Sequence, residues 1–257
     1  MQAGSQLRPN FRARLKGALP EPVRRWLRGL LIGDRARSLS PVRWGEFRRT
    51  RPFSRKFGYD RGTPVDRFYI DQFLARFASD ITGRVLEIKD STYTRRFGGE
   101  RVTRADVLDI DRENASATII ADLNVDRVPK GAFDCIILTQ TLQLIYDFRA
   151  ALESLSEGLK PGGVLLITVP GLTPISSKSL GNTWYWAFTG ASVHRLLTDT
   201  FPPGSDISVD LNGNVLSAVA FLEGLAAQEL RPEEMSVQDP DYQVIITARV
   251  VKPVDEI

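Results

Sequence analysis

The chain has 257 residues, of which 42% are hydrophobic and 25% charged, with a formal net charge of +3 at pH 7. This composition is typical of a soluble globular protein, and the length is sufficient for one α/β domain with an appendage. No apolar run approaches the roughly 20 residues of a membrane-spanning helix, and the single cysteine, Cys135, excludes an internal disulfide bond. Because no disulfide can form within the chain, we expect a reducing, cytoplasmic compartment. The single histidine, His194, excludes the common zinc sites, so we expect no metal.

The N-terminal segment is predicted to be a separate, basic extension. Residues 1–60 contain 15 Lys or Arg and 4 Asp or Glu, a balance of +11, which leaves −8 for the remainder. Residues 20–32 have an apolar helical face opposite arginines. This helix could lie on an anionic membrane at its inner face, or dock on the domain or a partner, which is the commoner case. We predict neither a cleavable signal nor nucleic-acid binding, because arginines interrupt the apolar runs and no recognition motif is present.

An α/β domain is predicted over residues 61–257. Its lead-in, residues 52–70, is too dense in glycine, proline and aromatic residues for a featureless linker. The first helix is expected from Val65 to about Ser79, with Phe68, Phe73, Leu74 and Phe77 facing inward.

The first predicted strand, residues 83–88, is a short apolar run. It ends at Glu87 and is followed by the polar turn Lys89-Asp90-Ser91-Thr92. Only residues 89–103 connect it to the next strand, which is near the minimum length for a parallel crossover, so we expect one or two helical turns there.

Two further strands end in acidic residues. Residues 107–111 end the second strand, where an acid can accept hydrogen bonds from both hydroxyls of an adenosine ribose. Asp109 is our first choice for this acid, and Asp111 is better placed to start the following turn. Residues 118–123 end the third strand.

A complete strand, helix, turn and strand unit follows, and it is typical of nucleotide-binding folds. Residues 133–138 form a buried apolar strand, and Asp147 caps a helix with an apolar stripe. The turn Leu159-Lys-Pro-Gly-Gly163 ends that helix, because proline cannot continue it and glycine accepts positive backbone angles. Residues 164–169 form the next strand.

Residues 171–188 leave this strand and are the predicted substrate wall. Aromatic rings with nearby hydroxyls suit a sugar ring or a planar acceptor. The candidate substrate-binding residues are Thr173, Ser176, Trp184 and Tyr185. Trp186 and Phe188 are better explained as anchors that hold the loop to the next helix.

The last elements complete the sheet. The helix around His194 has Val193, Leu196 and Leu197 on its apolar face, so His194 is predicted to lie on the surface. A strand at residues 207–211, a helix at residues 215–230 and a strand at residues 242–250 follow. The predicted fold is α/β: a Rossmann-like, doubly wound, seven-stranded and mostly parallel sheet with one antiparallel edge strand.

Residues 66–250 resemble class I S-adenosylmethionine-dependent methyltransferases. The resemblance rests on the strand ending in Glu87 and on the Leu159-Lys-Pro-Gly-Gly163 turn between the fourth and fifth strands. It implies S-adenosylmethionine as the cofactor. The chain departs from the family in its first motif, where no glycine follows Glu87 until Gly98.

The resemblance also implies roles for individual residues. Asp109 aligns with the ribose-binding acid, Asp122 with an adenine contact, and Lys89 could pair with the methionine carboxylate. In this family the lead-in can close over the cofactor, which makes Arg67 and Tyr69 candidates for contact with it. The full set of candidate cofactor-binding residues is Glu87, Lys89, Asp90, Ser91, Thr92, Asp109, Ile110, Ala121, Asp122, Leu123, Thr139, Gln140, Arg67 and Tyr69.

The lead-in stretch Arg61-Gly-Thr-Pro-Val-Asp-Arg67 resembles a bacterial subgroup associated with glycosyltransferases and surface-polysaccharide synthesis. It implies methyl transfer to a hydroxyl group of a glycan or a glycosylated metabolite. Related enzymes often carry a glutamate and a histidine where this chain has Gln140 and Leu144, so Gln140 and His194 are the only candidates for a catalytic role. The alternative is an inactive, methyltransferase-like partner of a membrane-associated glycan assembly complex.

Overall fold

The computed structural model describes residues 43–176 and 180–254, and the predicted helix at residues 20–32 lies outside them. The chain divides into two compact units, Met1–Thr50 and Arg51–Ile257. The larger unit therefore begins before the predicted boundary at residue 61 and includes the whole lead-in. In the smaller unit the structure describes one short 3₁₀ turn, Gly45–Phe47.

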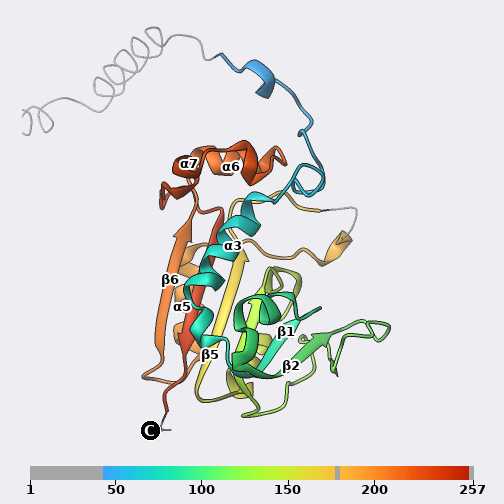
Figure 1. The fold of residues 1–257 in the computed structure, drawn as a ribbon, viewed down its shortest axis with the longest axis vertical. Helices are drawn as coiled ribbons and strands as arrows, with labels where there is room; N and C mark the ends of the chain where they lie inside the picture. Colours follow the sequence, from blue (N-terminus) through green and yellow to red (C-terminus); the bar gives the residue numbers. More distant parts are fainter. Residues whose placement is uncertain (1–42, 177–179, 255–257) are drawn as a thin grey trace, which may run out of the picture. The chain divides into compact units, whose positions relative to one another are not determined.

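The larger unit is built on one seven-stranded sheet with the order β3-β2-β1-β4-β5-β7-β6 (Figure 1). The strands are β1 (Gly83–Ile88), β2 (Val102–Asp109), β3 (Ile119–Ile120), β4 (Phe133–Thr139), β5 (Leu159–Pro170), β6 (Asp206–Asn212) and β7 (Ile245–Val251). Strand β7 runs antiparallel to both β5 and β6. The predicted α/β fold is confirmed, and the reversed strand lies one place in from the edge.

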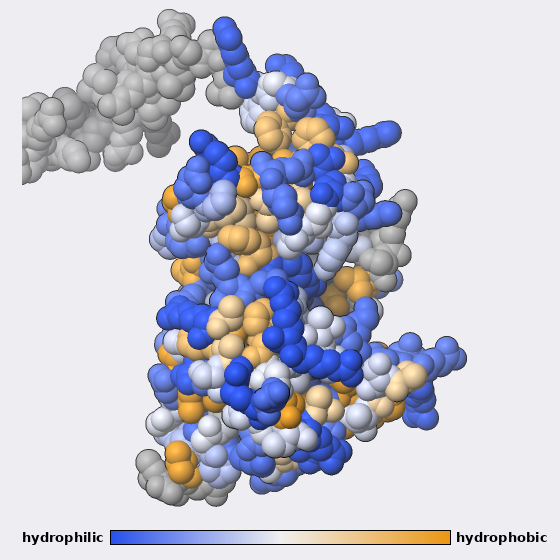
Figure 2. All heavy atoms as spheres, viewed as in Figure 1, coloured by the Kyte–Doolittle hydropathy of each residue, from blue (hydrophilic) through white to orange (hydrophobic). Residues whose placement is uncertain are grey.

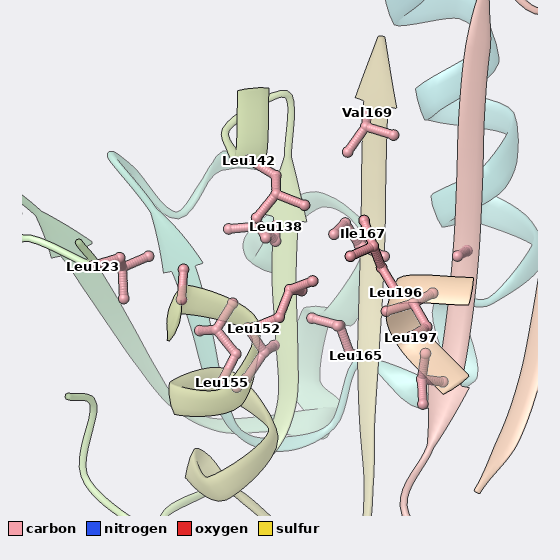
Figure 3. Packing of buried hydrophobic residues seen from close by; sticks show 14 of the residues in the cluster. Leu123, Leu138, Leu142, Leu152, Leu155, Leu165, Ile167, Val169, Leu196 and Leu197 are labelled. Atoms are coloured by element: carbon pink, nitrogen blue, oxygen red, sulfur yellow. The ribbon is translucent and has the colours of Figure 1, made fainter. Parts of the chain in front are cut away.

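Helices cover both faces of this sheet, because its strands are apolar on both sides. The helices are α3 (Val65–Arg76), α4 (Phe148–Gly158), α5 (Gly190–Thr200), α6 (Val215–Leu222) and α7 (Pro232–Ser236). Helices α4 and α5 pack on one face, in the core cluster shown in Figure 3, and α3 and α6 pack on the other. Among residues 43–176 and 180–254, no helix is long and apolar enough to cross a membrane.

Several local predictions are confirmed. The Asp147 side chain caps α4 by accepting a hydrogen bond from the Ala150 amide at 3.1 Å. The crossover after β1 contains only a π-helical turn, Thr94–Gly98, and a 3₁₀ turn, Gly99–Arg101. Burial of the predicted apolar stripe of α5 leaves His194 exposed.

The prediction of one helix over residues 215–230 is wrong. Helix α6 ends at Leu222, and Gly224 follows with a φ of 69°, which breaks the helix. A Cβ atom on Gly224 would lie 2.2 Å from the Ser54 carbonyl oxygen, so the approach of the lead-in requires glycine there. Pro232 then starts α7, because proline is tolerated in the first turn of a helix.

Candidate active site at the carboxyl edge of the sheet

The predicted cofactor residues follow neighbouring strands at one edge of the sheet. In the sheet register Glu87 of β1 lies between Val107 of β2 and Ile137 of β4. Asp109 of β2 pairs with Ile120 of β3. The parallel strands end together at this carboxyl edge, where open α/β sheets bind their ligands.

The turn after β1 keeps the shape of a glycine turn without a glycine. Lys89 has a φ of 76°, in the left-handed region that favours glycine. Its amide donates to the Leu108 carbonyl oxygen at 2.8 Å, and its carbonyl accepts from Asn114 Nδ2 at 2.7 Å. These two backbone contacts hold the strained conformation and leave the Lys89 side chain exposed.

Two carboxylates of the chain occupy the amide groups that follow this turn. Asp90 Oδ1 accepts from the Thr92 amide at 2.8 Å, and Glu87 accepts from the amides of Tyr93 and Thr94 at 3.1 and 2.7 Å. Glu87 is buried, and burial raises its pKa although the bonds from Thr94 and Tyr93 act in the opposite direction. Glu87 therefore shapes the turn, and the amides of Thr92, Tyr93 and Thr94 already have acceptors within the chain.

Arg67 is a cation beside this turn. Its Nε donates to the Tyr59 hydroxyl at 2.8 Å and lies 3.9 Å from Asp66 Oδ2. Burial alone would lower the pKa of Arg67, but Asp66, Tyr93 and Tyr59 outweigh burial and raise the pKa above its ordinary value. The guanidinium therefore stays charged. The guanidinium also interacts with Tyr93, the residue that follows the turn Lys89-Asp90-Ser91-Thr92.

Tyr69 does not belong to the site. It is 1% exposed and lies in the core between α3 and the sheet. Its hydroxyl donates to the Met235 carbonyl oxygen at 3.2 Å. The expectation that Tyr69 touches the cofactor is therefore not supported, because both its ring and its hydroxyl are used in packing.

Asp109 stands at the end of β2 as predicted. Its Oδ1 accepts from the Asp111 amide at 3.0 Å, and its Oδ2 accepts from Asn114 Nδ2 at 2.7 Å. A carboxylate has about four lone-pair positions, so these bonds fix its orientation and leave acceptor capacity for ribose hydroxyls. Ile110 beside it is 64% exposed, which provides an apolar surface for an adenine ring. Asp111 caps the following turn through the Glu113 amide at 2.9 Å.

The residues that follow β3 alternate between buried and polar side chains. Ala121 and Leu123 are buried beneath the edge, and Asp122 is half-buried between them. Asp122 Oδ1 accepts from the amide and the side chain of Asn124, at 2.9 and 2.8 Å. Asp122 thus caps its own loop with one oxygen, and these bonds leave Oδ2 for a ligand amino group.

After β4, Gln140 adopts a second strained conformation. Its φ is 48°, and its amide donates to the Thr168 carbonyl oxygen at 3.0 Å. Thr139 before it is half-buried and accepts at its carbonyl from Thr141 Oγ1 at 3.0 Å. Non-glycine residues with positive φ cluster at functional sites, and Lys89 and Gln140 lie at the same edge.

Gln143 connects Gln140 to the predicted substrate wall, a role that we did not predict. Its Nε2 donates to the Gln140 carbonyl at 2.9 Å, and its own carbonyl accepts from the amides of Tyr185 and Trp186 at 3.0 and 3.3 Å. The side chain is 2% exposed, and its Oε1 has no hydrogen-bond partner among the described residues. The only sequence signal was a glutamine in an otherwise apolar run.

The aromatic residues of the wall divide into anchors and exposed rings. Trp186 donates to the Ile145 carbonyl at 3.0 Å and packs edge-on against Phe148, and Phe188 is buried, so both are anchors as predicted. Tyr185 is 46% exposed and meets the 66% exposed Tyr146 edge-on, with ring centres 5.3 Å apart. Tyr146 ends residues 139–146, which we predicted to form the floor of the site, but it was not among the predicted substrate-binding residues.

The other predicted wall residues, Thr173, Ser176 and Trp184, are half-buried. Trp184 stacks on Phe57 of the lead-in, with ring centres 6.4 Å apart. Thr173 Oγ1 donates to the adjacent Pro174 carbonyl at 3.1 Å. Ser176 is half-buried and precedes residues 177–179, which lie outside the described residues.

An adenosyl ligand with an amino-acid tail requires acceptors for its ribose hydroxyls, an apolar surface for adenine and a positive charge for its carboxylate. At this edge Asp109 has acceptor positions to spare, and the side chains of Ile110 and Lys89 are exposed. A separate groove of about 640 Å³ lies between α3, the π-helical turn and the α6–α7 connection, and no candidate cofactor residue lines it.

Comparison with known proteins agrees with this geometry. A family model described as a methyltransferase domain matches residues 50–201, which is more than half of the chain. An S-adenosylmethionine-dependent methyltransferase from Mesorhizobium loti has a similar structure, with 13% identity and a TM-score of 0.51, covering 73% of this chain and 98% of that one.

The [4+2]-cyclase SpnF is similar at 14% identity and a TM-score of 0.51, covering 76% of this chain and 85% of that one. Identities this low show the fold alone, and no curated protein matches the chain. The family model carries the assignment: the chain belongs to the methyltransferase domain family, and S-adenosylmethionine is its cofactor.

Proposed function

We propose that the chain transfers the methyl group of S-adenosylmethionine to a hydroxyl group on a sugar, carried by a surface glycan or a glycosylated metabolite. The observation that carries this proposal is the exposed pair of Tyr146 and Tyr185. Aromatic faces pack well on the apolar face of a sugar ring, and the phenol hydroxyls can bond its polar rim. The proposal places the protein in polysaccharide synthesis in the cytoplasm.

The tyrosine pair is tied to the cofactor edge by a short chain of hydrogen bonds. The Tyr185 amide donates to the Gln143 carbonyl, and Gln143 Nε2 donates to the Gln140 carbonyl. Gln140 in turn follows β4 at the edge where the cofactor residues gather. These bonds hold the backbone of Tyr185 relative to Gln140, and a fixed acceptor position favours an in-line approach of its oxygen.

The cofactor, when bound, supplies an electrophilic methyl group, and the chain's residues bind the cofactor and orient the acceptor. Asp109 would hold the ribose, and Lys89 and Arg67 would hold the carboxylate through charge. Gln140 Nε2 lies 3.4 Å from Thr168 Oγ1, a weak contact that an acceptor oxygen can replace.

No strong base is needed in this arrangement. Gln140 cannot take a proton at neutral pH, but it can orient the acceptor hydroxyl by hydrogen bonding. Methyl transfer would form an oxygen–carbon bond and break the methyl–sulfur bond, so that S-adenosylhomocysteine would leave with the electron pair on sulfur. The hydroxyl proton would pass to solvent, because the wall is open at Tyr146 and Tyr185. Positioning alone can supply roughly 7 to 11 kcal/mol of the barrier reduction.

The test is methyl transfer to a panel of glycan acceptors by wild type, Tyr185→Ala and Tyr242→Ala. Tyr242 is a matched control, 38% exposed but outside the wall. Loss of a stacking ring costs about 1 to 1.5 kcal/mol, so KM for the acceptor should rise roughly tenfold in Tyr185→Ala alone, with unchanged affinity for S-adenosylhomocysteine. Equal KM values in the three proteins would refute the sugar platform.

One observation favours a second candidate function, an inactive methyltransferase-like partner of a glycan assembly complex. Asp90 and Glu87 occupy the amides of Thr92, Tyr93 and Thr94, where a glycine-rich turn usually faces its ligand. Calorimetric titration with S-adenosylmethionine separates the two candidates. Absence of binding by a folded protein favours the inactive partner, and binding with turnover favours the enzyme.

A further inference from the structure

Helix α6 has an unusually apolar outer face. Its sequence, Val-Leu-Ser-Ala-Val-Ala-Phe-Leu, contains no charged residue. The buried face is formed by Ser217, Ala218, Ala220 and Phe221. The opposite face leaves four aliphatic side chains in water, Val215 at 51%, Leu216 at 42%, Val219 at 39% and Leu222 at 46% exposure. A helix at the surface of a soluble domain normally presents charged residues there.

The apolar surface continues beyond the helix. Asn214, the N-cap of α6, donates from Nδ2 to the Val237 carbonyl at 2.8 Å, and Val237 is 57% exposed. We call the group of Val215, Leu216, Val219, Leu222 and Val237 the α6 patch. In Figure 2 hydrophobic surface lies among hydrophilic residues around α6 and α7, at the end of the domain where β6 terminates. Exposed apolar side chains gathered on one face of a helix mark an interaction site.

Basic residues border one end of the α6 patch. The Ser54 amide donates to the Glu223 carbonyl at 3.1 Å, which holds the lead-in against the C-terminal end of α6. Arg51, Arg55 and Lys56 of this stretch are exposed. Two acids lie nearby: Asp60, which accepts from Ser54 Oγ at 2.5 Å, and Glu223, the half-buried C-cap residue of α6. Arg51, Arg55 and Lys56 thus outnumber the carboxylates of Asp60 and Glu223, and the border of the α6 patch at Leu222 has a net positive charge.

The other end of the α6 patch is acidic. The Asp239 amide donates to the Gly213 carbonyl at 2.8 Å, beside the start of α6, and Asp241 is exposed nearby. The charged residues that border the α6 patch are thus basic at one end of the helix and acidic at the other. A negatively charged surface is attracted at the Leu222 end and repelled at the Val237 end.

We propose that the α6 patch docks on an anionic membrane surface, with Leu222 and Val219 inserted among the lipids and Arg51, Arg55 and Lys56 on the headgroups. Apolar side chains flanked by basic residues have the chemistry of interfacial membrane binding. The sequence continues this charge, since residues 1–50 contain 12 Lys or Arg and 3 Asp or Glu. A second copy is a poorer occupant, because it doubles the charge of the basic segments, whereas anionic lipid neutralises it.

The experiment measures binding of the full-length chain to vesicles of phosphatidylcholine alone and of an equimolar mixture with phosphatidylglycerol, at low and high salt. No cofactor or acceptor is present, so the outcome is independent of the proposed methyl transfer. The test variant is Val219→Gln with Leu222→Gln. The matched control is Val125→Gln with Val254→Gln, at side chains that are 79% and 74% exposed elsewhere. Thermal unfolding confirms that all the variants are folded.

Wild type is expected to bind the anionic vesicles and to retain part of this binding at high salt, because salt screens charge and not apolar insertion. The test variant should lose at least about tenfold in partition coefficient at high salt, and the control should match wild type. Arg55→Gln with Lys56→Gln should weaken binding roughly tenfold or more at low salt.

Three results would overturn the proposal. The first is wild type that ignores anionic vesicles at low salt. The second is a test variant that binds as wild type does, which would leave the basic segment as the only contact. The third is a dimer, measured by light scattering, that the test variant converts to monomer while vesicle binding is unchanged, which would make the α6 patch an interface between copies.

Discussion

Replacement of Lys89 by glycine should stabilise the protein and weaken the cofactor complex at the same time. Lys89 is held at a φ of 76° by its backbone bonds to Leu108 and Asn114. The left-handed conformation costs an L-residue about 1 to 2 kcal/mol. Glycine removes this cost but adds about 0.5 to 1 kcal/mol of chain entropy in the unfolded state. The net gain is roughly 0.5 to 1 kcal/mol.

Such a gain corresponds to roughly 1 to 4 °C in the midpoint of thermal unfolding for a domain of this size. Lys89→Ala is the matched control, because it removes the same charge and retains the Cβ atom that causes the strain. Both variants should weaken S-adenosylhomocysteine binding by the same modest factor, since an exposed ion pair contributes about 0.2 to 1 kcal/mol. The assays are differential scanning calorimetry and isothermal titration calorimetry. A Lys89→Gly protein that is no more stable than Lys89→Ala would refute the strain argument.

Two further predictions concern catalysis and acid stability. Gln140→Ala should slow methyl transfer, whereas His194→Ala should retain nearly the full rate, because His194 is exposed on α5. A loss of about 100-fold or more in the initial rate of His194→Ala would identify His194 as the catalytic base. Burial raises the pKa of Asp106, but bonds from Arg84, Thr118 and Arg104 outweigh it and place its pKa below the usual range. Its stabilisation, about 1 to 3 kcal/mol, is therefore present above the unfolded pKa of about 3.9 and is lost as pH falls through the folded pKa. Urea unfolding of Asp106→Asn against pH should show a smaller loss of stability in acid than wild type, and parallel curves would contradict this.

The features that sequence predicted well depend on local spacing. The stripe of Val193, Leu196 and Leu197 has helical periodicity, so it fixed which side of α5 is buried and left His194 outside. Asp147 precedes an apolar helical run, and a carboxylate there caps the helix wherever the helix packs.

The features that sequence did not predict depend on contacts between distant segments. The break in α6 follows from the approach of Ser54 to Gly224, and neither residue alone signals it. Gln143 gains its role from the amides of Tyr185 and Trp186, which a local pattern cannot show. From the sequence, Tyr69 fits either a ligand contact or a core residue. The structure decides for the core, because the Tyr69 hydroxyl donates to the Met235 carbonyl oxygen.

The most direct test of a cofactor site at this edge is calorimetric titration of S-adenosylhomocysteine into wild type, Asp109→Ala and Asp111→Ala. Asp109 accepts at the end of β2 beside Ile110, whereas Asp111 only caps the next turn. Wild type should bind, Asp109→Ala should bind about 1.5 to 3 kcal/mol more weakly through loss of charge-assisted bonds, and Asp111→Ala should bind nearly as wild type does. Failure of folded wild type to bind, or equal affinity of wild type and Asp109→Ala, would contradict the site.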